Sequence, residues 1–285
     1  MRTRSFLLNA RPARGVSFLL PWVLFVAGVG GYFYAARERH LVNPDERVTP
    51  TMTEMLKGMA GAALRPPGDE EEPALRGTWS TRFFTSMLWT DTTATARRFL
   101  FAMLLLVPAV LLGLHIGVFP YAGLTLERFV LFFDKIVALS LLPVLFIVFG
   151  IDELSKVMLI VIGVAPTVVL DTANLARGVP QEQIIKALTL GAGDFDVAYR
   201  VVFKQILPRV FDGIRLNLKA VTLFLFAGEM IASTDGLAYR IALLRRHMGM
   251  DVIVPYVLWV ALLLFLVDSG MRRLNRKLHP WFQEA

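Results

Sequence analysis

Long apolar stretches alternate with shorter polar segments along most of the chain. Six of them hold about twenty mostly apolar residues each, at 17–36, 98–118, 127–150, 154–175, 213–233 and 252–270. A helix of about 20 apolar residues is long enough to cross the hydrocarbon core of a bilayer. The pattern therefore predicts an all-α polytopic membrane protein with about six transmembrane helices.

The first stretch also has features of a secretory signal peptide. Arg2, Arg4, Arg11 and Arg14 precede it, with no acidic residue among them. The apolar run is longer than the 7–15 residues of a signal-peptide core. We therefore expect 17–36 to remain in the protein as the first transmembrane helix.

The predicted crossings divide the chain into four parts. These are a cytoplasmic N-terminus with the first helix (1–36), an external loop (37–97), a core domain (98–270) that includes a cytoplasmic segment (177–212), and a cytoplasmic tail (271–285). Six crossings place both termini on one side of the membrane. Both termini are basic, which is typical of cytoplasmic segments, so we expect both in the cytoplasm.

The external side of this topology has two further features. Short amphipathic helices are expected at 51–64 and 80–92, within the loop. Arg240, Arg245 and Arg246 fall between the fifth and sixth stretches, where basic residues run against the preference for positive charge inside. These arginines would attract an anionic solute or a partner protein, or else anchor the chain at lipid headgroups.

The composition excludes several kinds of chemistry. The 285 residues include no cysteine, which excludes thiolate metal sites, iron–sulfur clusters and cysteine nucleophiles. No GxxxxGK[ST] sequence occurs, so the chain has no P-loop for ATP. The net charge of +7 is accounted for by basic residues that flank membrane helices, and no nucleic-acid partner is expected.

The polar segment after the fourth stretch predicts a short amphipathic helix. Pro180 suits the first turn of a helix, and Ile184, Ile185 and Leu188 form an apolar stripe at helical spacing. Gly191 then allows a left-handed exit. Such a helix fits a groove in a soluble partner or, alternatively, the headgroup layer of the membrane.

A second helix is expected directly afterwards, over 195–206. Asp194 is placed to cap its start, and Leu207–Pro208 is placed to end it before the fifth stretch. The segment resembles the EAA loop of ABC importer permeases, whose pattern is EAAxxxGA followed by LP. Ala187, Gly191–Ala192 and Leu207–Pro208 match that pattern, while Ile185 and Lys186 replace its Glu and first Ala.

Three other stretches carry the same resemblance, in order and with similar spacing. They are VTPTMTEML (48–56), LLPVLFIVFGIDELSK (141–156) and GEMIASTDGLAYRI (228–241). Together they resemble the taurine, sulfonate and nitrate branch of ABC importer permeases. The resemblance spans about 48–282 and implies the transmembrane domain of a type I importer.

The family resemblance implies a permease subunit of an ATP-driven importer in the cell inner membrane. A second copy of the permease would complete the path for a small solute, such as a sulfonate, taurine, nitrate or a similar anion. Cytoplasmic ATPase subunits would bind ATP and Mg²⁺, and a periplasmic or lipid-anchored binding protein would deliver the solute. The chain itself would bind no cofactor and would not be an enzyme.

Two sets of residues are candidates for these roles. The resemblance implies an ATPase-coupling set, which consists of Ile184, Ile185, Lys186, Ala187, Leu188, Gly191, Ala192, Leu207 and Pro208. Charged residues inside apolar stretches are costly to insert and therefore need a role. The candidates for the translocation path are Asp134, Lys135, Ser140, Glu229, Ser233 and Thr234.

Several of these residues have plainer alternatives. Asp134 and Lys135 would lie near cytoplasmic headgroups, and as neighbours about 100° apart on a helix they would pair poorly. Glu229 would cap a short re-entrant helix that begins near 234–236, or line the path. His115 is expected to be an interface residue and not a ligand.

Two other classes of function fit part of the pattern. A non-ABC channel, or a scaffold subunit of a larger complex, would explain the apolar stretches but not the segment 180–208. A membrane-embedded enzyme would need His, Asp or Glu clustered at one depth, and the sequence shows no such cluster.

Overall fold

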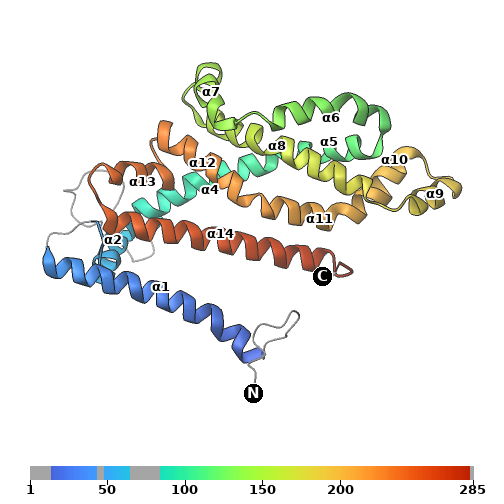
Figure 1. Cartoon of the computed structure of the whole chain (residues 1–285). Helices are drawn as coiled ribbons and strands as arrows, with labels where there is room; N and C mark the ends of the chain where they lie inside the picture. The colour runs from blue at the N-terminus through green and yellow to red at the C-terminus, as the bar shows by residue number, and fades with distance from the viewer. Residues whose placement is uncertain (1–13, 44–47, 65–83, 283–285) are drawn as a thin grey trace.

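The computed structural model describes residues 14–43, 48–64 and 84–282 (Figure 1). Regular structure in these residues is helical, as the sequence predicts. The longer helices are α1 (Arg14–Val42), α4 (Met87–Leu105), α5 (Val107–Val118), α6 (Pro120–Asp134), α8 (Glu153–Arg177), α11 (Phe203–Leu216), α12 (Leu218–Ala232) and α14 (Met250–Leu278). The shorter helices are α2 (Met52–Leu64), η2 (Ala138–Leu141), α7 (Leu142–Phe149), α9 (Gln181–Thr189), α10 (Asp194–Asp196), the π-helix η3 (Val197–Val202) and α13 (Leu237–Arg245).

Helix α8 lies at the centre of the bundle and contacts α4, α5, α6, α7, α11 and α12. Its approach to α5 is close because Gly113 and Gly117 face it at GxxxG spacing. A Cβ added to Gly113 would lie 2.5 Å from the carbonyl oxygen of Val169, and one on Gly117 would lie 2.7 Å from that of Ala173. Small residues at this spacing let two membrane helices pack backbone against backbone.

The second crossing begins earlier than the sequence predicts. Helix α4 starts at Met87, and only Leu106 separates it from α5, so the two form one 32-residue span. The segment 37–97 is therefore not a loop throughout, and the helix expected at 80–92 is not a separate element. Helix α2 confirms the helix expected at 51–64.

The third predicted stretch, 127–150, is broken. Helix α6 already begins at Pro120 and ends at Asp134, and the chain then turns by 81° into η2 and α7. A charged residue ends α6, and Pro143 occupies the first turn of α7, so the backbone has local reasons to bend here. The apolar pattern alone does not distinguish a straight span from this bent pair.

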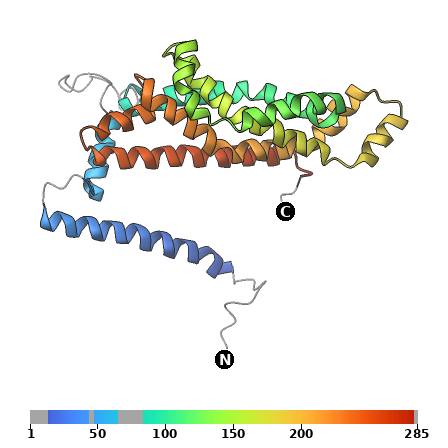
Figure 2. The ribbon, with the colours of Figure 1, turned by 45° about the horizontal axis from the view of Figure 1, so that its top comes forward.

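The bundle has two distinct ends. Helix α9 lies at one end, toward which the beginning of α1 and the last turns of α14 also point, while α2 and α13 lie at the other (Figures 1 and 2). Among the described residues, three helices are long and apolar enough to cross a membrane, and two bent pairs raise the number to five. Helix α1 covers the predicted first crossing as one continuous helix.

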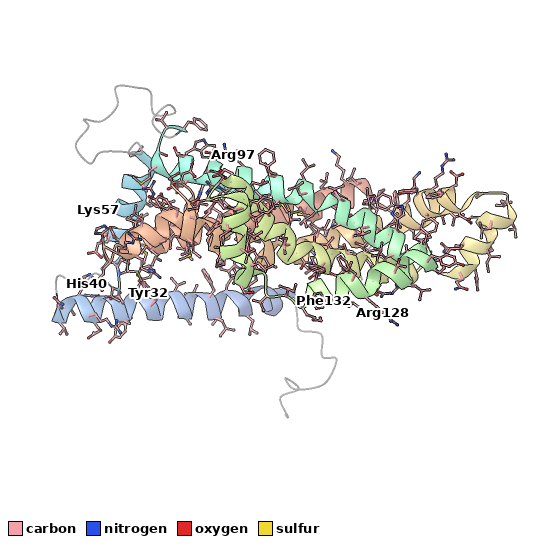
Figure 3. The ribbon with its side chains drawn as sticks, turned by 90° about the horizontal axis from the view of Figure 1, so that it is seen from above. Tyr32, His40, Lys57, Arg97, Arg128 and Phe132 are labelled. Carbon is pink, nitrogen blue, oxygen red and sulfur yellow. The ribbon has the colours of Figure 1, made fainter. Side chains whose placement is uncertain are left out.

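Helix α1 stands apart from the bundle along most of its length (Figure 2). Its contacts lie near its end, where the Tyr32 hydroxyl donates to the Pro50 carbonyl at 3.3 Å and His40 Nε2 lies 3.5 Å from a Glu54 carboxylate oxygen. Figure 3 shows Tyr32 and His40 on the part of α1 that lies beside α2. The first crossing is thus attached to the rest of the chain through α2.

Candidate functional site

Helix α9 forms the tip of one end of the bundle (Figure 1). It begins one residue later than the sequence predicts, because Pro180 is its N-cap and not a residue of its first turn. Glu182 places a negative charge in that first turn, near the positive end of the helix dipole. Gly191 has a φ of +88°, which confirms the left-handed exit.

The apolar side chains of α9 divide between two directions. Ile184 and Ala187 are half-buried and pack against the main hydrophobic core. Ile185, Leu188 and the following Leu190 are 56%, 42% and 88% exposed. The helix is thus fixed by one side while it presents a second apolar side outward, with Lys186 also exposed.

The second predicted helix differs from the structure at both ends. Gly193 is the N-cap, and Asp194 is the first helical residue instead of the cap. Pro208 lies inside α11 and does not end the helix, which runs on to Leu216. The missing N–H of Pro208 leaves the carbonyl of Lys204 without its helical donor.

Contacts from neighbouring crossings hold this segment in place. The Tyr199 hydroxyl lies 3.1 Å from His115 Nε2, and the other His115 ring nitrogen lies 2.7 Å from a backbone carbonyl of α5. This agrees with the expectation that His115 is an interface residue. On α14, Asn275 Nδ2 donates to the carbonyl of the buried Pro208 at 3.0 Å. Leu207–Pro208 therefore lies beside α14 and not at the α9 tip.

At the opposite end of the bundle, three backbone N–H groups at the start of α13 donate to side chains. The N–H of Gly236 donates to Asp91 Oδ1 at 3.1 Å, and the N–H of Leu237 donates to Thr95 Oγ1 at 2.9 Å. The N–H of Ala238 donates to Glu229 Oε2 at 3.1 Å. These are donors that a helix start leaves without intrahelical partners.

A buried arginine joins this start to the rest of the bundle. Arg98 is 1% exposed, and its guanidinium donates to Glu153 at 2.5 and 2.7 Å, to Glu229 Oε1 at 2.8 Å and to the Asp235 carbonyl at 2.9 Å. It also donates to the Asp235 carboxylate. We call Arg98 with these three acidic residues the arginine clamp. It links α4, α8, α12 and the α12–α13 turn.

The turn leaves no space for a side chain at Gly236. Its φ is +120°, and an added Cβ would lie 2.6 Å from Glu229 Cδ and 2.7 Å from Arg98 Nη1. Glu229 itself is fully buried and occupies the capping position considered from the sequence. Within this chain its carboxylate faces Arg98, Thr95 and the start of α13.

Sequence reasoning missed most of this cluster. Asp91 and Thr95 fell inside the predicted external loop, although with Arg98 they repeat at i, i+4 and i+7, on one face of a helix. Arg240 was expected to be an outward-facing cation, which is wrong, because its guanidinium donates to Asp91 at 2.9 Å and is largely buried. The other two arginines, Arg245 and Arg246, are exposed.

The predicted path residues gather at the two bends. At the first, Asp134 accepts from Thr167 at 3.0 Å and pairs with Lys135 at 2.9 Å, and Ser140 is exposed. The Asp134–Lys135 pair was expected to be poor, but Lys135 is the C-cap of α6 and its ammonium lies 2.9 Å from the Asp134 carboxylate.

At the second bend, Glu229 is buried, Ser233 is half-buried and Thr234 is exposed. The first bend packs against the helix that precedes the second, because η2 contacts α12. No group of three potential metal ligands occurs among residues 14–43, 48–64 and 84–282. Irregular backbone at membrane depth is tolerated where it lies inside protein or lines a water-filled cavity.

The comparisons with known proteins agree on one family. Residues 97–280 match the family described as binding-protein-dependent transport system inner membrane component. The chain is 30% identical over 226 residues to the taurine transport system permease protein TauC of Escherichia coli K12, which covers 78% of this chain and 81% of TauC. It is 31% identical over 177 residues, 60% of this chain and 63% of the relative, to a candidate aliphatic sulfonates transport permease, SsuC, of Bacillus subtilis.

A solved structure shares the fold. The MetNI methionine ABC transporter in an inward-facing conformation superimposes with a TM-score of 0.55 at 18% identity, over 67% of this chain and 93% of that one. The family match and the conserved fold favour a permease over a non-ABC channel or a scaffold subunit. The chain therefore belongs to the binding-protein-dependent transport system inner membrane components, as a permease subunit of an ABC importer with a type I fold.

Proposed function

We propose that this permease imports a small anionic solute, such as a sulfonate, taurine or nitrate. Two relatives carry taurine and aliphatic sulfonates in their names, which supports the choice of solute class. Two copies of the chain would form the path, since a single chain leaves the polar bend residues Lys135, Ser140 and Thr234 exposed. A binding protein would deliver the solute from outside.

Helix α9 is the element that we assign to the ATPase. The observation that carries this assignment is the outward apolar side of Ile185, Leu188 and Leu190 on a helix whose other side is anchored in the core. An amphipathic helix of this kind suits a groove in a soluble partner. ATP and Mg²⁺ would then bind in the partner ATPase, and its closure would move the two α9 helices.

The same assignment orients the protein in the membrane. If α9 meets a cytoplasmic ATPase, the beginning of α1 and the end of α14, which point to the same end of the bundle, are cytoplasmic as well (Figure 1). The four cations at 272–277 then lie inside, in agreement with the positive-inside preference. The turn between α13 and α14 is external.

Substitution of the exposed side of α9 tests the coupling role. Leu188→Asp places a charge in the proposed contact, and an unpaired buried charge costs several kcal/mol. We expect the ATPase to be lost during detergent purification and ATP-dependent uptake into proteoliposomes to fall to background. Gln183→Asp is the matched control, because Gln183 is exposed on the same helix but about 140° from Leu188.

Two outcomes would contradict the proposal. If Leu188→Asp retains both the ATPase and normal uptake, α9 is not the coupling element. If the intact system transports none of taurine, an alkanesulfonate or nitrate, while a different solute is taken up in an ATP-dependent manner, the coupling role stands and the solute class is wrong.

A further inference from the structure

Helix α14 packs along one side of the bundle. It packs against α2 and α13 near its beginning and against α11 farther along. Between these contacts, α4, α12 and α14 enclose a cavity of about 140 Å³. Its walls include Phe99, Leu225, Phe226, Val260, Leu264 and Val267. The cavity therefore lies within helices that have the length and composition of membrane spans.

The hydroxyl protons in the wall are already donated within the chain. The hydroxyl of Thr92 donates to the Leu88 carbonyl at 2.6 Å, and that of Thr222 donates to the Leu218 carbonyl at 2.9 Å. The Thr95 hydroxyl donates to Glu229 at 2.8 Å. A buried water needs two to four polar partners, so the occupant of this space is apolar.

The size of the cavity limits the occupant further. A cavity of about 150 Å³ accommodates a molecule as small as benzene, whereas a helix with its side chains is about 10 Å wide. Neither α1 nor a helix of a second copy fits into it. On α14, Val260 and Leu264 are half-buried and Val267 is partly exposed, so the wall is not sealed from the surrounding hydrocarbon.

Charge and depth point to one kind of lipid. Asp268, next to Val267, forms ion pairs with Arg215 at 3.2 Å and with Arg272 at 2.9 Å. Residues 268–278 contain four cationic residues and Asp268 as their single acidic residue. At about 1.5 Å per residue, Val260 lies about 18 Å from Arg272, close to the roughly 15 Å depth of one leaflet. If the phosphate of a lipid lies at Arg272, its acyl chain is therefore long enough to reach the cavity.

We propose that the cavity binds a segment of one acyl chain of an anionic phospholipid, whose phosphate lies at Arg272. The chain would touch Thr95 and Leu237, which also line the cavity and hold the start of α13. A bound lipid would thus support the arginine clamp from the membrane side. This site is separate from the α9 contact and does not depend on which solute the importer carries.

Native mass spectrometry of the purified full-length protein, delipidated and titrated with phosphatidylglycerol, tests the site. We expect one tightly held lipid per chain. Val260→Phe fills the cavity and should weaken that binding about tenfold, the effect of leaving roughly two methylene groups unburied. Leu258→Phe, at an exposed position on the same helix, should bind lipid like the parent protein.

The headgroup is tested separately. Arg272→Gln should remove the preference for phosphatidylglycerol over phosphatidylcholine, while Arg273→Gln, also exposed, should keep it. Lipid binding that is unchanged by both Val260→Phe and Arg272→Gln would overturn the proposal.

A second measurement does not depend on affinity. Trp259 donates to Thr92 at the cavity wall, so in a variant with Trp259 as its sole tryptophan, tail-brominated phosphatidylglycerol should quench its fluorescence. Adding Val260→Phe should reduce this quenching, and Leu258→Phe should not. Equal quenching in the two variants, or disulfide cross-linking of Leu264→Cys between two copies, would overturn the lipid assignment.

Discussion

The two ends of the bundle are held together by different forces. At the α13 end, a buried arginine, three carboxylates and a threonine satisfy one another and the first N–H groups of α13. At the α9 end, the helix is anchored by half-buried apolar side chains and leaves Leu188 and Leu190 in the open. The clamp and the capped N–H groups at the α13 end have their partners within the chain, whereas the α9 end exposes apolar groups that a partner would cover.

This difference is informative for a transport protein. Polar groups buried within one chain fix a geometry, because breaking one contact leaves an uncompensated charge. Exposed apolar side chains on a rigid support are instead suited to a contact that forms with another protein. We therefore interpret the α13 end as a fixed structural unit and the α9 end as the proposed contact with the ATPase.

The largest expected effect is at the centre of the arginine clamp. Arg98→Met leaves Glu153, Glu229 and Asp235 without their common cation, and removal of one partner of a buried pair costs about 3–5 kcal/mol. Thermal unfolding in detergent should show a large loss of stability. Arg97→Met is the control, because Arg97 is exposed on the neighbouring face of α4 and lies 3.8 Å from Glu153 (Figure 3). Equal losses in the two variants would contradict the clamp.

The next effect is expected at the turn before α13. Gly236→Ala combines a positive φ with a Cβ that meets Glu229 and Arg98, so strain of about 1–3 kcal/mol is expected together with displacement of the clamp. Thermal unfolding measures it. Gly213→Ala, at a helical position with nothing within 4 Å of the added Cβ, should instead be neutral or gain up to about 1 kcal/mol.

Gly191→Ala should have a smaller effect on the other end. Its φ of +88° disfavours alanine by about 1–2 kcal/mol, but no atom lies within 4 Å of the added Cβ. The substitution should loosen the exit from α9 without any clash, so the ATPase should copurify with reduced yield while the unfolding temperature changes little. A loss of stability as large as that of Gly236→Ala would show that the α9 end is also fixed by contacts within the chain.

The smallest effect concerns the junction of α1 and α2. The Thr51 N–H, which donates to Glu54 at 2.8 Å, lowers the pKa of Glu54 below its ordinary 4.5, and His40 contributes to the same direction. The stabilisation is complete above pH 4.5 and is lost as the pH falls through the lowered pKa. Because the Glu54 carboxylate is also the group that His40 of α1 approaches at 3.5 Å, spin-label distances between α1 and α2 should widen as Glu54 is protonated in acid, and Glu54→Gln should remove this pH dependence. A distance that does not change with pH in the parent protein would contradict it.

These features differ in how far the sequence reveals them. The crossings, the short helix near 181–189 and the left-handed Gly191 follow from local periodicity and from the conformational freedom of glycine. The arginine clamp does not, because Arg98 is 55, 131 and 137 residues away from its three acidic partners, and only the folded bundle brings them together. The bend after Asp134 was missed because a continuous apolar pattern does not show whether the helix axis changes direction.

The arginines of α13, which the sequence placed in a loop, show a related limit. Positive charge outside the membrane was interpreted as a surface property, but Arg240 is paired with Asp91, a residue that the sequence placed in a loop. An error of several residues in the start of α4 therefore changed the inferred role of a cation in another helix. Helix boundaries decide which polar residues can meet, and they are the least certain part of a sequence pattern.

The most direct test of the whole account is the thiol-labelling rate of single cysteines on α9, which is straightforward because the chain has none of its own. Leu188→Cys and Gln183→Cys are both exposed in the isolated chain. On addition of the ATPase subunits, we expect Leu188→Cys to become protected and Gln183→Cys to label at its former rate. Unchanged labelling at both positions in an assembled, transporting complex would contradict the assignment of the α9 end as the contact with the ATPase.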